Sequence, residues 1–246
     1  MRKATKATRQ VLLTCLMGLA GCFSLSRVEP AQQHYVLGGS APGDGPALRG
    51  RLAGLTLGVR RLRLAPYLEP PFVVVRQGDH QIRYAEFQRW GERLDGGINR
   101  AVAGYLRARA SFAAVDVAPW PSGETYDYLV QLRVDRFEGQ IPDDSAAVEG
   151  EAHLLAGWEI IRQEDETVLA RGATDYRKTG WRVGDHAGLV ALLDAGLDVL
   201  SADLAAALEK LVAGSVTEDG GRSQAAPASS FGTTPLRAIP PPTSQD

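Results

Sequence analysis

The sequence predicts an α+β fold in which two amphipathic helices pack on one face of a mainly antiparallel sheet. Two long stretches, residues 128–135 and 152–160, alternate apolar with polar side chains, which is typical of paired strands with one buried face. Residues 90–106 and 187–213 instead place apolar side chains every three or four positions, which is typical of amphipathic helices. Because strands lie before and between these helices, we expect one sheet that both helices cover.

Shorter apolar runs that are bounded by turn residues predict the remaining strands. These strands are expected at residues 55–64, 72–75, 81–84, 112–117 and 167–177. Gly78-Asp79, between the second and third of these runs, indicates a hairpin. Residues 163–166 form the turn that precedes the last strand.

Each predicted helix carries one apolar stripe. The stripes consist of Trp90, Leu94, Ile98, Ala101, Val102, Tyr105 and Leu106, and of Leu189, Leu193, Leu197, Leu200, Leu204, Leu208 and Leu211. Gly96 and Gly97 each weaken the first helix by about 1 kcal/mol relative to alanine, so we expect them to allow close packing on the sheet. Asp185 is the expected N-cap of the second helix and Gly214 its expected end.

The first 21 residues have the composition of a signal peptide. Four basic residues precede an apolar run at residues 11–19, and the small pair Ala20-Gly21 follows. A membrane-spanning helix needs roughly 20 apolar residues, so this run is too short to be one.

The segment Leu19-Ala20-Gly21-Cys22 resembles the lipobox at which the signal of a bacterial lipoprotein is cut. The resemblance implies cleavage before Cys22 and a covalent diacylglycerol and N-acyl chain on that cysteine, with no other cofactor. Cys22 is the only cysteine of the mature chain, because Cys15 leaves with the signal, so no disulfide accounts for it. An ordinary signal that happens to place a cysteine at the cut is the alternative.

The residues after Cys22 bear on which membrane holds the anchor. In enteric bacteria an aspartate at this place tends to retain lipoproteins in the inner membrane, and this chain has Phe23 and Ser24 instead. We therefore expect a lipid-anchored protein at the outer membrane, on its periplasmic face.

Composition divides the mature chain into three parts. Residues 22–50 combine the lipidated N-terminus with a Gly/Pro-rich linker, and residues 51–214 hold the α+β domain. Residues 215–246, rich in proline and serine, are expected to be a disordered tail, because they cannot bury enough apolar surface to offset their conformational entropy. This tail is either dispensable or a flexible arm that reaches peptidoglycan or a partner.

The charge of the mature chain argues against two classes of function. Removing the signal takes four of the 27 basic residues and none of the 29 acidic ones, which leaves a formal balance of −6. A nucleic-acid-binding protein would show a basic surface, and peripheral attachment to anionic lipids would need a cluster of basic residues.

The sequence contains none of the common catalytic or metal-binding motifs. The four histidines are scattered, and His153 falls on the polar face of its predicted strand, where we expect it to be solvated. The carboxylate pair Asp143-Asp144 and the run 164–166 lie in turns, although two carboxylates far apart in sequence could still meet in space. The sequence therefore predicts that the protein is not an enzyme and holds no metal.

An ordered set of residues follows residue 64. It consists of a turn, Pro66-Tyr67-Leu68; a strand with Val74 and Arg76; and Trp90, Glu92 and Leu94, expected to open a helix that ends with Leu106. Together with the lipobox and with Tyr35 and Leu37 near the start, this set resembles the ABC-type transport auxiliary lipoprotein (PqiC-like) family, over roughly residues 22–214. We interpret the motif residues as structural rather than as ligand contacts.

The resemblance implies a non-enzymatic subunit of an envelope transport system for lipids or other hydrophobic molecules. Its partners would be an MCE-domain protein and a membrane permease of the same system, and the lipoprotein would dock the periplasmic MCE component at the outer membrane. A homo-oligomeric ring would suit docking to a symmetric tube.

Two other functions remain open at this point. One is a lipoprotein binding module that regulates peptidoglycan synthesis or envelope assembly, for which the C-terminal tail should be essential. The other is an envelope hydrolase whose site combines residues that are distant in sequence.

Overall fold

The computed structural model describes residues 31–39, 50, 52–121, 123–143 and 146–222. The chain divides into two units, residues 1–33 and 34–246. Only residues 31–33 of the first unit are described, so the lipobox with Cys22 lies outside the described residues. None of the helices in the described ranges is both long and apolar enough to cross a membrane.

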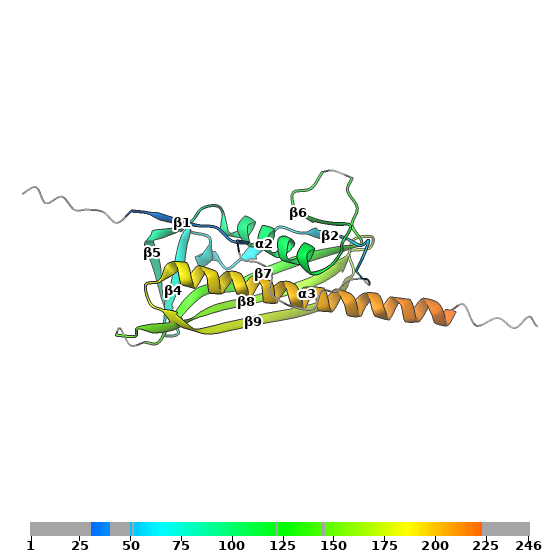
Figure 1. The fold of residues 1–246 in the computed structure, drawn as a ribbon. Helices are drawn as coiled ribbons and strands as arrows, with labels where there is room; N and C mark the ends of the chain where they lie inside the picture. Colours follow the sequence, from blue (N-terminus) through cyan, green and yellow to red (C-terminus); the bar gives the residue numbers. More distant parts are fainter. Residues whose placement is uncertain (1–30, 40–49, 51, 122, 144–145, 223–246) are drawn as a thin grey trace, which may run out of the picture. The chain divides into compact units, whose positions relative to one another are not determined.

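The described elements follow one another along the chain, and Figure 1 labels most of them. They are β1 (Gln33–Tyr35), β2 (Thr56–Val59), β3 (Arg63–Leu64), the 3-10 helix η1 (Pro66–Leu68), β4 (Phe72–Gln77), β5 (Gln81–Trp90), α2 (Leu94–Arg109), β6 (Ala114–Val117), β7 (Tyr128–Ile141), β8 (Glu149–Arg162), β9 (Val168–Arg182) and α3 (His186–Arg222).

Strand β7 is the axis of the sheet. One of its edges pairs antiparallel with β8, which in turn pairs antiparallel with β9. Along its other edge lie β2, β3 and β4 in succession, all parallel to β7. Beyond these, β5 forms an antiparallel hairpin with β4, and β6 lies parallel to β2. The three long strands β7, β8 and β9 thus form a continuous meander on one side of the sheet.

The predicted α+β class is confirmed, but the sheet is mixed rather than mainly antiparallel. The β4–β5 and β7–β8 hairpins match the prediction because short turns join their strands. The parallel pairs arise because the chain returns through α2 to the edge of β2, and because β2, β3 and β4 all run along β7 in the same direction. Strand direction across such a crossover cannot be deduced from alternation in a single strand.

The strand predicted at residues 55–64 is divided into β2 and β3. The chain still follows β7 through the break, since the backbone N–H groups of Arg60 and Ala65 donate to carbonyl oxygens of β7 at 2.9 Å. Trp90 is also placed differently from its prediction as the start of a helix: it is the last residue of β5, and α2 begins at Leu94. The extended backbone of Arg93, the N-cap, separates the two elements.

The helices cover the sheet as predicted (Figure 1). Helix α3 packs against β7, β8 and β9, and α2 packs against α3 and β6. The fully buried side chains of the two stripes meet in one core; they are Ile98, Val102, Leu106, Leu189, Leu193, Leu197, Leu200, Leu204 and Leu208. Fully burying an aliphatic side chain of this kind contributes about 1.5–3 kcal/mol, so the two stripes supply much of the stability of the domain.

Of the predictions about helix ends and helix glycines, the N-cap is confirmed, whereas the C-terminal end and the role of the glycines are wrong. Asp185 is the N-cap of α3, and its Oδ1 accepts a hydrogen bond of 2.9 Å from Gly188 N–H. Gly214 does not end the helix: its φ is not positive, and the backbone stays helical to Arg222. Gly96 and Gly97 do not serve close packing on the sheet: a Cβ at Gly96 would meet nothing within 4 Å, and one at Gly97 would meet the Glu92 side chain.

The first eight residues of the tail that was predicted to be disordered are therefore helical, and residues 223–246 lie outside the described part.

Candidate functional site

The face of the sheet that points away from α3 carries a row of polar side chains. A Cβ at Gly196 of α3 would lie 2.8 Å from the Tyr176 ring, so Tyr176 faces the helix. The next residue along β9, Arg177, therefore points to the opposite face. Its register partner on β8 is His153, and the partner of His153 on β7 is Glu138. Three neighbouring strands thus place ionisable groups side by side.

The centre of this row is a buried ion pair between β4 and β7. Arg76 Nε lies 2.5 Å from Glu138 Oε1, and Arg76 Nη2 lies 3.3 Å from Oε2. Glu138 is completely buried and Arg76 is only 9% exposed. Arg76 also donates to the backbone oxygen of Asp79 at 3.1 Å, and Arg136 reaches Glu138 at 3.5 Å. The short hydrogen bond to Glu138 raises the pKa of Arg76.

Tyr67 covers one side of this ion pair. Its hydroxyl donates to the backbone oxygen of Asp135 at 2.9 Å, and the Arg76 guanidinium lies 5.5 Å from the centre of its ring. Burial, and then the charge of Glu138, raise the pKa of Tyr67, which keeps the phenol protonated. Pro66 starts η1 and Leu68 is fully buried, so the Pro66-Tyr67-Leu68 turn serves to hold the Tyr67 ring in this place.

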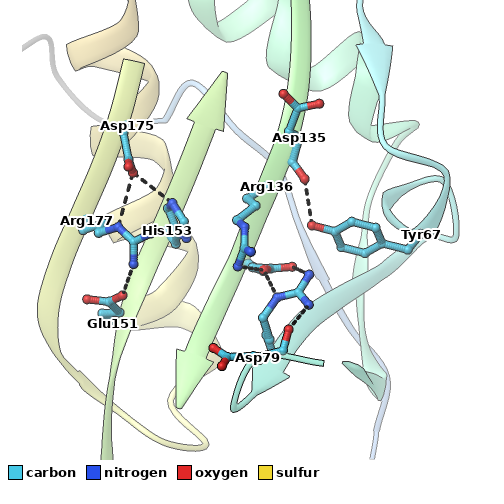
Figure 2. A network of polar contacts seen from close by, with 10 residues as sticks. Tyr67, Asp79, Asp135, Arg136, Glu151, His153, Asp175 and Arg177 are labelled. Carbon is cyan, nitrogen blue, oxygen red and sulfur yellow. Dashed lines mark hydrogen bonds and ion pairs between the residues drawn. The ribbon is translucent and has the colours of Figure 1, made fainter. Parts of the chain in front are cut away.

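His153 links the centre of the row to β9, as Figure 2 shows. Its Nε2 lies 2.9 Å from Asp175 Oδ1, and Arg177 contacts the same carboxylate at 3.3 Å and Glu151 at 2.9 Å. We call the ten residues joined by these contacts the polar network: Tyr67, Arg76, Asp79, Asp135, Arg136, Glu138, Glu151, His153, Asp175 and Arg177.

The prediction that His153 is solvated is wrong. The side chain does lie on the face away from the helices, but its neighbours on β7 and β9 leave it only 1% exposed. Burial, followed by the charge of Arg177, lowers its pKa. Its Nδ1 has no hydrogen-bond partner within the described ranges.

An open hollow of about 580 Å³ adjoins the network at the end of the sheet. Four carboxylates line it, Asp79, Asp143, Glu149 and Glu151, together with Gln140. Asp143, predicted as a solvated turn residue, is thus exposed but lies near other acidic groups. No group of three or more potential metal ligands occurs among the described residues.

The remaining motif residues belong to the core and to one surface ion pair. Trp90 is buried with its ring centre 5.7 Å from that of Phe137, and Leu94 is buried at the start of α2. Glu92 forms an ion pair with Arg100 of α2. The motif predicted from the sequence therefore supplies only Tyr67 and Arg76 to the polar network.

No sequence motif includes Glu138, Arg136 or Asp175. Glu138 does interrupt a strand whose other buried positions are apolar, which is a signal for a paired charge. Its partners could not be identified, because they depend on the register between strands and on the parallel pairing of β4 with β7. The assembled groups bond mainly to one another, so the network is a fixed array of charges.

Solved structures resemble this fold. A crystal structure of a Xanthomonas campestris protein of family DUF330 is 16% identical, with a TM-score of 0.56, and the match covers 76% of this chain and 98% of that one. A crystal structure of an uncharacterized protein is 19% identical, with a TM-score of 0.56, and the match covers 73% of this chain and 99% of that one. A PelC dodecamer from Paraburkholderia phytofirmans is 22% identical, with a TM-score of 0.36, and the match covers 63% of this chain and 91% of that one.

No curated protein matches the sequence. A family model does match, over residues 35–205, a range that includes most of the described elements and the whole polar network. The resemblance seen in the sequence is thereby confirmed, and the chain belongs to the family of the ABC-type transport auxiliary lipoprotein component.

Proposed function

We propose that this protein is a non-enzymatic lipoprotein subunit of an ABC/MCE-type envelope transport system for lipids or other hydrophobic molecules. The observation that carries the proposal is the family match over residues 35–205. In this role the protein docks the periplasmic MCE component, and an MCE-domain protein and a membrane permease of the same system are its partners.

The proposal includes a lipid anchor on Cys22 at the outer membrane, on its periplasmic face. The lipobox Leu19-Ala20-Gly21-Cys22 and the lone cysteine of the mature chain support it. Two or three acyl chains anchor a protein stably, because each buried methylene contributes on the order of 0.8 kcal/mol.

The polar network and the acidic hollow beside it are the docking surface in this proposal. Asp175, Glu151 and Arg177 are held by ion pairs between strands, so little side-chain entropy is lost when a partner binds them. Charged groups held in place in this way favour a partner with complementary charges.

A homo-oligomeric ring is part of the proposal as well. Strand β9 pairs only with β8 within the described ranges, so its other edge carries unpaired backbone groups over 15 residues. An edge of this length offers a contact between neighbouring subunits, and head-to-tail contacts of one kind form a ring when the rotation from subunit to subunit closes.

The docking surface can be tested by co-purification with the MCE-domain protein encoded in the same system. Arg177→Glu reverses a charge inside the network, and we expect it to reduce capture by about tenfold or more. Arg171→Glu is the matched control, since Arg171 lies on the same strand and pairs with Glu159 outside the network. Loss of capture in both variants, or in neither, would contradict docking at this surface.

The same experiment separates the transport function from the alternative, a binding module that regulates peptidoglycan synthesis or envelope assembly. A chain that ends at Arg222, where α3 ends, should still capture the MCE-domain protein. If the full-length protein captured peptidoglycan synthases only, and lost them in this truncation, the binding-module function would replace the transport function.

A further inference from the structure

Among the ten residues of the polar network, His153 is the histidine, the side-chain type that changes its charge near neutral pH. It lies in the middle of the row and is only 1% exposed. Burial, and then the charge of Arg177, hold its pKa below the usual value of 6.5, so the ring is neutral at pH 7.5. A buried group that gains a charge at lower pH can rearrange the ion pairs around it, and these ion pairs form the proposed docking surface.

The proton of the neutral His153 ring lies on Nε2. This nitrogen is 2.9 Å from Asp175 Oδ1, and a carboxylate oxygen accepts hydrogen bonds. A second proton therefore binds Nδ1, which it reaches through brief local openings of the sheet face. Nδ1 has no hydrogen-bond partner in the part of the chain that the structure describes, so the new N–H group would be a buried donor without an acceptor. The charged ring does not fit the present arrangement of its neighbours.

Charged side chains face the ring from both neighbouring strands and from its own strand. They are Arg136 and Glu138 on β7, Asp175 and Arg177 on β9, and Glu151 on β8. Glu138 accepts a hydrogen bond of 2.5 Å from Arg76 of β4, and Glu151 accepts one of 2.9 Å from Arg177. Because arginines already bind these two carboxylates, Asp175 is the carboxylate that responds to a charge on the ring.

Two donors share one oxygen of Asp175, as Figure 2 shows. His153 Nε2 lies 2.9 Å from Oδ1, and Arg177 Nε lies 3.3 Å from the same atom. While the ring is neutral, Arg177 is the only cation of the two. Once the ring is charged, its bond to Oδ1 becomes charge-assisted, and the two cations repel each other across this oxygen. One of the two donors then has to leave.

Arg177 is the donor that can leave. Its side chain is 47% exposed, so the guanidinium can turn into solvent and recover its hydration there. The ring of His153 is enclosed by its neighbours, and a charged ring that turned away from Asp175 would stay buried without a counter-charge. Arg177 keeps its bond to Glu151 through Nη1, so its release concerns the contact of Nε with Asp175.

We propose that His153 is a pH switch for the polar network: on taking up a proton, its ring keeps Asp175 Oδ1 and releases Arg177 from that carboxylate. The network holds the arrangement of Figure 2 while the ring is neutral and loses it as the pH falls and the ring becomes charged. Where it concerns docking, this inference rests on the proposed function, because Arg177 belongs to the proposed docking surface. Capture of the MCE-domain protein is then strongest at neutral pH and weaker in an acidified periplasm.

The first part of the test needs no partner. It follows the side chains by NMR in the full lipidated protein in phosphatidylcholine nanodiscs, with nitrogen-15 in arginine and histidine. Between pH 7.5 and 5, Arg177 Nε should become more mobile with the same midpoint as the titration of the His153 ring. His153→Gln should abolish this change, because its amide can donate to Asp175 but takes up no proton. Arg171 Nε, which binds Glu159 outside the network at 2.8 Å, is the matched control and should stay unchanged. A ring that does not titrate in this range, or an Arg177 that stays equally ordered while it does, would overturn the proposal.

The second part compares capture of the MCE-domain protein at pH 7.5 and pH 5, each variant against its own value at pH 7.5. The wild-type protein should lose about threefold on acidification, the range expected for one exposed ion pair, and His153→Gln should lose less. His186→Gln is the matched control: burial lowers the pKa of His186 too, but this residue starts α3, outside the network, so the variant should lose as much as the wild type. Equal losses in the wild type and His153→Gln would overturn the switch. Absence of capture at both pH values would contradict the proposed function instead, since the NMR result stands by itself, and thermal melting confirms that each protein is folded at pH 5.

Discussion

At the scale of single residues, the polar network depends on one completely buried carboxylate. Glu138 loses its hydration on folding and regains contacts from Arg76 and Arg136. Breaking a buried ion pair by removing one partner leaves an uncompensated charge, which is more costly than losing an exposed pair. The network should therefore be most sensitive at its centre and least sensitive at its exposed ends.

Glu138→Gln should lower the free energy of unfolding by about 3 kcal/mol, because Arg76 would stay buried without a counter-charge. Glu159→Gln is the matched control, since its pair with Arg171 is exposed, and it should cost less than about 1 kcal/mol. Urea unfolding of both variants measures the difference. Equal losses would show that the buried pair does not stabilise the fold.

His153 should make stability depend on pH. Its pKa in the folded protein lies below the usual value of about 6.5, so the folded state binds fewer protons than the unfolded state in this range. Stability is thus complete above pH 6.5 and falls as the pH drops from there through the folded pKa. Glu138 and Arg136 on β7 and Asp175 and Arg177 on β9 surround the ring.

The dependence should be smaller in His153→Gln, as measured by urea unfolding between pH 7.5 and 5. Some dependence remains in that variant, because burial also lowers the pKa of His186. An unchanged slope would show that His153 does not titrate with folding.

At the scale of elements, contact between α3 and the sheet depends on glycine at Gly196. A Cβ there would lie 2.8 Å from the Tyr176 ring, so Gly196→Ala should destabilise the protein by about 1–3 kcal/mol through overpacking. Gly104 of α2 is the control: nothing lies within 4 Å of a Cβ there, and Gly104→Ala should stabilise the helix by about 1 kcal/mol. Thermal unfolding measures both effects. A melting temperature that changed in the same direction in both variants would contradict this packing.

The elements that the sequence predicts correctly are those that depend on residues close together in the chain. The leucine stripe of α3, the Asp185 N-cap and the β4–β5 hairpin each follow from residues a few positions apart. The parallel pairing of β4 with β7 and the burial of His153 depend instead on register between distant strands. For the same reason Tyr67 and Arg76 could be selected as motif residues, whereas their contact with Glu138 could not be predicted.

At the scale of the whole molecule, the domain and its anchor have separate roles in the proposed function. Residues 35–205 carry the family match, and Cys22 lies upstream of it, outside the described residues. Position at the membrane and recognition of a partner should therefore be separable by mutation.

Cys22→Ala should abolish incorporation of radiolabelled palmitate and leave the precursor uncut, because the lipobox then lacks the cysteine before which the lipoprotein peptidase cuts. The melting temperature of the domain should not change. Globomycin, which blocks the lipoprotein peptidase, should leave the wild-type precursor uncut. Normal processing in its presence would mean that an ordinary signal peptidase cuts the chain and that the anchor does not exist.

The most direct test of the central claim is site-specific photo-crosslinking in cells. A photoreactive residue at Thr179, which lines the hollow beside the network, should crosslink to the MCE-domain protein. The same residue at Val199, exposed on α3, should not. Crosslinking at Val199 but not at Thr179 would place the partner on the helices, and absence of MCE crosslinks at both positions would contradict docking altogether.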